Sequence, residues 1–117
     1  MRNILALLAL PIVLVAGSAY AGNVRGPQST VDGVDPHGTD VYTMVFEAEQ
    51  KAQVVVSGDG STDLDCYVYD GNGNLLKSDT DSTDTCVLTW IPKWEGKFQV
   101  KIRNHGDIIN IYRISTN

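Results

Sequence analysis

The chain has 117 residues, with nine lysines and arginines against fourteen aspartates and glutamates, so its formal net charge at neutral pH is −5. An acidic chain without a basic stripe is poorly suited to nucleic acid or to an anionic lipid surface, because phosphate groups would repel it. Its length allows one domain with a modest hydrophobic core.

The first 21 residues have the features of a secretory signal peptide. Arg2 gives a positive start, residues 4–16 are apolar, and Ala19-Tyr20-Ala21 is a small-x-small cleavage sequence. The apolar run is shorter than the ~20 residues that a membrane-spanning helix needs. We therefore expect a protein exported to the periplasm or the extracellular space. Its mature chain would be residues 22–117, with no membrane insertion once the signal is removed.

The only two cysteines, Cys66 and Cys86, both lie in the exported part. An oxidising compartment favours a disulfide between them, and closing a loop of about 20 residues would stabilise the fold by roughly 3 kcal/mol. A redox or zinc role has little support, because there is no C-x-x-C spacing and two thiolates do not make a zinc site.

After residue 21, apolar residues recur at every second position and no helical period is visible. Residues 22–38 are rich in Gly, Pro and Asp, which predicts an extended, loosely tied lead-in. The alternation beyond them predicts strands near residues 40–48, 52–56, 64–70, 75–76, 85–91, 96–103 and 108–115.

The last of these strands has an irregular pattern. Ile109 and Ile111 fall on one parity, whereas Tyr112 and Ile114 fall on the other, so we expect a β-bulge between them. Seven or eight short strands without crossover helices predict an all-β fold, an antiparallel β-sandwich of the jelly-roll kind.

Several motifs resemble the bacterial pre-peptidase C-terminal domain over residues 39–117. Asp40-Val41-Tyr42 resembles the start of the family's opening strand. The remaining motifs are Thr62-Asp63-Leu64-Asp65, Tyr67-Val68-Tyr69-Asp70, Trp90-Ile91-Pro92, Gly96-Lys97-Phe98, Asn104, Asn110 and Tyr112. The resemblance implies a non-catalytic jelly-roll domain of a family that usually accompanies secreted peptidases. Relatives in bacterial collagenases bind collagen and calcium. This chain looks like a stand-alone exported member.

Carboxylates gather between residues 59 and 84, where seven aspartates face a single lysine. Asp63 and Asp65 lie on the same face of a predicted strand, close enough to reach one calcium ion, with Asp40 or loop carbonyls completing the shell. The resemblance also implies calcium ligands at this D-x-D. The alternative is that these aspartates cap turns and keep an exported protein soluble.

Three aromatic residues are candidate ligand contacts. Tyr67 and Tyr69 fall on the outward parity of their strand, and Trp94 follows a proline in a turn. Such side chains stack on sugars or peptides and are frequent at binding hot spots. The alternative is that a second sheet or a loop covers them.

Nothing in the sequence indicates a catalytic site. The two histidines, His37 and His105, lie in turns, and no nucleophile motif accompanies them. We therefore expect a monomeric, non-catalytic exported module that binds a protein or a polysaccharide. The alternative function is a calcium-stabilised structural protein, and a small hydrolase is the outlier.

Overall fold

The structure is a computed structural model that describes residues 22–117, and the predicted signal peptide lies outside these residues. Eight strands form two antiparallel sheets and no helix is present in the described part, which confirms the predicted all-β sandwich. The strands are β1 (Gln28–Val34), β2 (Thr39–Phe46), β3 (Ala52–Ser57), β4 (Leu64–Tyr69), β5 (Leu75–Asp79), β6 (Thr85–Trp90), β7 (Gly96–Asn104) and β8 (Asn110–Thr116).

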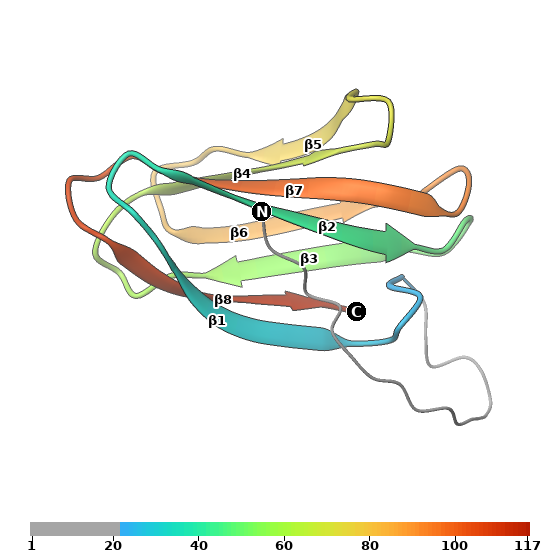
Figure 1. The fold of residues 1–117 in the computed structure, drawn as a ribbon, viewed down its shortest axis with the longest axis horizontal. Coiled ribbons are helices and arrows are strands. Elements are labelled where there is room, and N and C mark those ends of the chain that lie inside the picture. The colour runs from blue at the N-terminus through green and yellow to red at the C-terminus, as the bar shows by residue number, and fades with distance from the viewer. Residues whose placement is uncertain (1–21) are drawn as a thin grey trace.

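The strand order is that of a jelly roll. One sheet has the order β1-β8-β3-β6 and the other β2-β7-β4-β5, and the two are packed as layers in Figure 1. Most connections cross from one sheet to the other, which places β5 and β6 as the edges on one side of the sandwich. Within residues 22–117 no helix is long and apolar enough to cross a bilayer.

The predicted lead-in at residues 22–38 contains a full strand of the sandwich. All seven residues of β1 pair with β8, from Gln28 opposite Thr116 to Val34 opposite Asn110. Asn23 also forms a bridge with Phe46 in the other sheet. This segment is therefore extended, as predicted, but tightly held. Its sequence hides the strand because β1 is an edge whose side chains, except Val34, stay partly exposed.

The core lies between the two sheets and is filled by the inward parity of each strand. Phe46, Trp90 and Phe98 pack together at one end with ring centroids 4.9 to 6.0 Å apart, and Phe46 meets each of the other two rings edge to face. Tyr42 and Tyr112 meet at the other end with centroids 6.4 Å apart. Aromatic pairs in such geometry add to the stabilisation from buried apolar area.

The bulge expected in the last strand is absent. β8 pairs with β1 and β3 without a register shift, and Tyr112 and Ile114 are buried while Ile111 is exposed. The isoleucines that suggested the other parity face solvent. The one register shift between described strands lies between β4 and β5, at Val68 and Tyr69.

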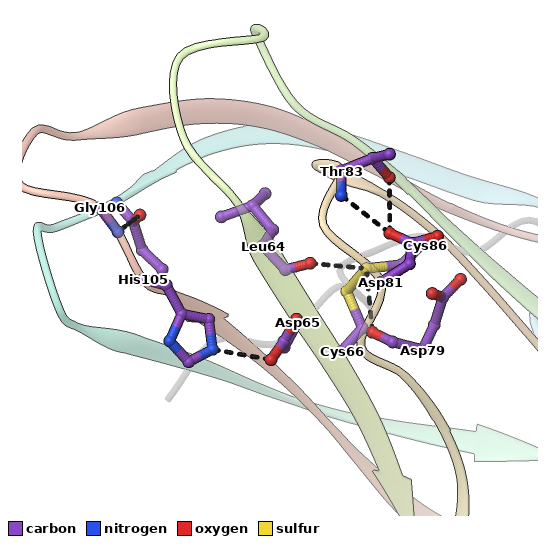
Figure 2. Close-up of polar contacts among 10 residues, drawn as sticks. Leu64, Asp65, Cys66, Asp79, Asp81, Thr83, Cys86, His105 and Gly106 are labelled. Carbon is purple, nitrogen blue, oxygen red and sulfur yellow. Dashed lines mark hydrogen bonds and ion pairs between the residues drawn. A yellow bond between two sulfur atoms is a disulfide. The ribbon is translucent and has the colours of Figure 1, made fainter.

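The predicted disulfide is confirmed, and it joins the two sheets. Cys66 lies on β4 and Cys86 on β6, with their Cα atoms 6.2 Å apart, and both are fully buried. The carbonyl oxygens of Leu64 and Asp79 lie 3.6 and 3.9 Å from Cys86 Sγ, as Figure 2 shows. The bridge therefore holds the two layers together beside the edge strands.

Candidate functional site

Asp63 and Asp65 lie together at the start of β4. Asp65 lies opposite Arg103 of β7 in the ladder, and its side chain faces outward. Its Oδ2 lies 2.7 Å from His105 Nε2, and Figure 2 shows this pair. The backbone N–H of His105 donates to the carbonyl oxygen of Asp63 at 3.0 Å. The Oδ1 atoms of both aspartates are buried without a hydrogen-bond partner. Two carboxylate oxygens are thus shielded from water and unpaired at the same place.

The predicted third ligand, Asp40, is not brought to this pair. It lies opposite Ile102, whose side chain is in the core, so Asp40 belongs to the inner face of the sheet and Asp65 to the outer. Asp40 Oδ2 accepts a hydrogen bond from the Tyr112 hydroxyl at 2.6 Å. Among residues 22–117, no three His, Cys, Asp or Glu side chains are grouped so that they could hold a metal ion.

Asp40 instead belongs to a buried hydroxyl network. The Tyr112 hydroxyl also lies 2.7 Å from the hydroxyl of Tyr42. Burial raises the pKa of Tyr112 well above its usual range, and its hydrogen bonds to Asp40 and Tyr42 raise it further. Tyr112 therefore stays protonated as the donor to Asp40, and the network is structural.

The stability of the domain should depend on pH through Asp63. Burial raises the pKa of its carboxyl, and the neighbouring charge of Asp65 raises it further. The folded protein thus holds this proton more tightly than the unfolded chain does. Protonated Asp63 contributes stability below its unfolded pKa near 3.8, and that contribution is lost as pH rises through the raised native pKa.

In EDTA, Asp63→Asn is therefore expected to be more stable than the wild type at pH 7, with a smaller difference at pH 3. Urea unfolding at both pH values measures it. Asp59→Asn is the matched control with the opposite sign, because hydrogen bonds from Ser61 and Ile111 lower the pKa of Asp59. A stability difference for Asp63→Asn that is equal at both pH values would contradict the assignment.

The two candidate tyrosines lie on the outer face of the β2-β7-β4-β5 sheet, both partly buried. Tyr67 is opposite Lys101, and Lys101 Nζ lies 4.9 Å from the centre of the Tyr69 ring. Burial, with the charge of Asp65 next in weight, raises the pKa of Tyr67. The β7 lysine thus covers part of the Tyr69 ring, which a partner would have to share.

Trp94, the third candidate, lies apart from the tyrosines and lines an apolar groove. The groove has a volume of about 260 Å³ and is formed by Leu76, Trp90, Ile91, Pro92, Trp94 and Phe98, with Asp70 and Lys93 at its polar positions. Phe98 faces the core, whereas Tyr69 pairs with Gln99 on the outer face, so the groove and the tyrosines lie on different faces of the sheet.

The groove contains one exposed tryptophan and one buried tryptophan whose indole N–H has no hydrogen-bond partner. Trp94 is 55% exposed and Ile91 65% exposed, so the groove presents two large apolar side chains to solvent. Trp90 is only 6% exposed, and its indole Nε1 is buried with no hydrogen-bond partner. A buried N–H without an acceptor costs about 1–3 kcal/mol, and this one belongs to a residue that lines the groove.

Two buried asparagines that the sequence analysis gave no role organise the loops at the end where β4 starts. Asn104 Nδ2 donates to the carbonyl oxygens of Val34 and Ile108, and its Oδ1 accepts from Gly106 N. Asn110 Oδ1 accepts from Asp59 N, and its Nδ2 donates to Thr62. Asn104 ends β7 and Asn110 begins β8, and these positions at the two ends of a turn were the available signal.

The outlying hydrolase gains no support from the histidines. His105 is paired with Asp65, and His37 Nε2 lies 2.6 Å from Asp107 Oδ1 in an exposed pair. Neither histidine lines the groove. To act as a general base, a histidine held by a carboxylate still needs a nucleophile within hydrogen-bond reach. The side-chain partners of His37 and His105 are the carboxylates of Asp107 and Asp65.

Comparisons with known proteins show the fold and nothing finer. No protein-family model matches the chain, and no curated protein matches it. Among solved structures, the pre-peptidase C-terminal domain of a Bacillus anthracis collagenase has a TM-score of 0.56 at 14% identity, covering 76% of this chain and 89% of that domain. The chain therefore has a fold like that of this domain.

Two further solved structures share the architecture. PliG of Aeromonas hydrophila, a periplasmic inhibitor of g-type lysozyme, has a TM-score of 0.57 at 15% identity, covering 90% of this chain and 91% of the inhibitor. The Yersinia pseudotuberculosis-derived mitogen has a TM-score of 0.58 at 12% identity, covering 78% of this chain and 84% of the mitogen. At 12–15% identity, these matches show a shared fold.

Proposed function

We propose that this chain is an exported, non-catalytic binding module whose ligand site is the Trp94 groove. The single observation that carries the proposal is the indole N–H of Trp90, buried without an acceptor in a residue that lines a mainly apolar groove. The buried disulfide supports export, since such bonds persist in oxidising compartments. The fold shared with PliG, a periplasmic inhibitor of g-type lysozyme, supports a binding role.

The chemistry of the groove favours a protein ligand over a glycan. Its volume of about 260 Å³ is below the ~300–1,000 Å³ typical of drug-sized sites, so it suits one large side chain. A sugar ring carries hydroxyl groups on most of its edges, and these would lose their hydrogen bonds against Leu76, Ile91 and Phe98. An apolar side chain with a neighbouring peptide carbonyl satisfies both the groove and Trp90 Nε1.

Titration of the mature domain with two small probes tests this proposal. N-acetylphenylalaninamide is expected to change the tryptophan fluorescence saturably, with a dissociation constant on the order of 1 mM for a ligand of that size. Chitotetraose is expected to give no saturable change. Trp94→Ala should abolish the response to the amide, whereas Tyr67→Phe, outside the groove, should keep it. A response to neither probe would refute the groove as a ligand site.

A second candidate function, the calcium-stabilised structural protein, is supported by the orphaned oxygens of Asp63 and Asp65. Calcium takes six to eight oxygen ligands at about 2.3–2.6 Å, and carboxylates are prominent among them. These two oxygens fit as ligands, while His105 already satisfies the other oxygen of Asp65. Backbone carbonyls or water would have to supply the rest of the shell.

Thermal unfolding in EDTA and then in millimolar calcium tests this candidate. At 100 times its dissociation constant, calcium would add about 2.7 kcal/mol and raise the melting temperature by roughly 10 °C or more. Asp65→Asn should abolish the shift. Asp70→Asn is the control, since the Asp70 carboxylate caps the turn at Asn72 and Asn74. Absence of a shift in the wild type would leave the aspartates as turn and surface residues.

A further inference from the structure

One side of the sandwich carries two strand edges, β5 and β6, that lie beside each other and pair with no further described strand. Among residues 22–117, β5 pairs only with β4, and β6 pairs only with β3. Trp90 ends β6, and the groove continues from it through Ile91 and Pro92. The edge of β6 therefore runs directly into the ligand groove.

Hydrogen bonds show which amides of β6 point away from its partner strand. The N–H of Val87 donates to Asp79 Oδ2 at 2.9 Å, so it does not face β3. In an antiparallel ladder this direction alternates, so the N–H and C=O groups of Thr85, Val87 and Thr89 all point to the free edge. Correspondingly, the backbone N–H of Gln53 on β3 points away from β6, and Asn117 Oδ1 accepts its hydrogen bond at 2.9 Å.

Side chains protect this edge at one end only. The hydroxyl of Thr83 accepts from Thr85 N at 3.2 Å while donating to Asp81 Oδ1 at 2.7 Å, and Asp79 caps Val87. Capping an edge with side chains is a common defence against unwanted strand pairing. Thr89 is the next outward position, and it lies immediately before the Trp90 that lines the groove.

From this arrangement, and resting on the proposed function of the groove, we propose that the module binds an extended segment of a partner protein as an added strand. The segment pairs with the edge of β6 at Thr89 and places one apolar side chain in the groove beside Trp94. Main-chain hydrogen bonds supply affinity in this mode of recognition, and the pocket for alternate side chains supplies specificity.

The charge of this side selects a basic segment. Asp70 lines the groove, Asp79 caps the β6 edge, and Asp81 and Asp84 lie in the loop that joins β5 to β6, against the lysines Lys77 on β5 and Lys93 in the groove. Alternate side chains of an added strand point away from the groove, where lysines or arginines would meet these carboxylates. The expected segment therefore alternates basic residues with smaller ones around a single large apolar residue.

A nonapeptide with capped ends, in which lysine alternates with threonine around one central phenylalanine, is the probe. Its binding is expected to change Trp94 fluorescence and to slow hydrogen exchange of the Thr89 amide at least tenfold in the mature domain. Replacing all lysines of the peptide with glutamate should weaken binding at least tenfold. Placing proline on both sides of the phenylalanine should do the same, because proline cannot take part in the ladder.

Two substitutions in the protein separate strand addition from groove filling. Thr89→Pro removes only an outward amide on an edge strand and should cost at least tenfold in peptide affinity, whereas Thr89→Val keeps the amide and should bind normally. If the peptide binds with no protection of Thr89, strand addition is wrong and the groove stands. If N-acetylphenylalaninamide binds and the peptide does not, the same conclusion holds. If neither binds, both proposals fail.

Discussion

Replacing Cys66 and Cys86 together with alanine is expected to lower the free energy of unfolding by about 3 kcal/mol and the melting temperature by roughly 15 °C. The bond closes a loop with a sequence separation of 20 and joins β4 of one sheet to β6 of the other. Without it the unfolded chain gains conformational freedom, and the folded sandwich loses its covalent link between layers. Urea and thermal unfolding of the mature domain measure both quantities.

Reduction of the wild-type domain is the matched control, because it breaks the same bond without removing side-chain atoms. The reduced wild type and the double alanine variant should lose similar amounts of stability, with the variant somewhat less stable because it leaves a small cavity in the core. A loss below about 1 kcal/mol in both would contradict the role of the disulfide as a principal constraint.

Asn104→Ala is expected to cost about 3 kcal/mol, because the fully buried amide of Asn104 serves three backbone groups. Its removal leaves the carbonyl oxygens of Val34 and Ile108 and the N–H of Gly106 without their partner. These groups hold the β7–β8 turn against the end of β1, so the loss should appear as global destabilisation. Thermal unfolding monitored by circular dichroism measures it.

Asn72→Ala is the control for this substitution. Asn72 is also an asparagine in a turn between strands, but its side chain is exposed. Surface substitutions of this kind usually change stability by less than about 0.5 kcal/mol. If Asn72→Ala and Asn104→Ala lowered the free energy of unfolding equally, the hydrogen bonds of the Asn104 amide would not be what stabilises these loops.

The sequence predicted the fold because its signal is local. Alternation along a strand such as Gly96–Asn104 reports which face is buried, and most expected strands lie within a few residues of the observed ones. It missed β1, since an edge strand buries too little to show a period. It also suggested a bulge in β8, which is absent, because exposed isoleucines such as Ile111 look like core residues in the sequence.

The candidate sites were harder to predict because they depend on contacts between distant segments. Asp40 and Asp65 look equivalent as carboxylates near strand starts, yet their parities place them on opposite faces of one sheet. Trp94 was predicted as an exposed platform, and its exposure is observed. Its partner in the groove, the orphaned indole of Trp90, follows only from three-dimensional packing.

The most direct test of a ligand site at the groove is the ¹⁵N–¹H spectrum of the mature domain, titrated with N-acetylphenylalaninamide. The chain has only two tryptophans, so two indole N–H signals report on the whole site. The account predicts that both signals move saturably, and that the Trp90 signal moves downfield as its N–H gains an acceptor. A Trp90 signal that stays unchanged at saturating probe would contradict it.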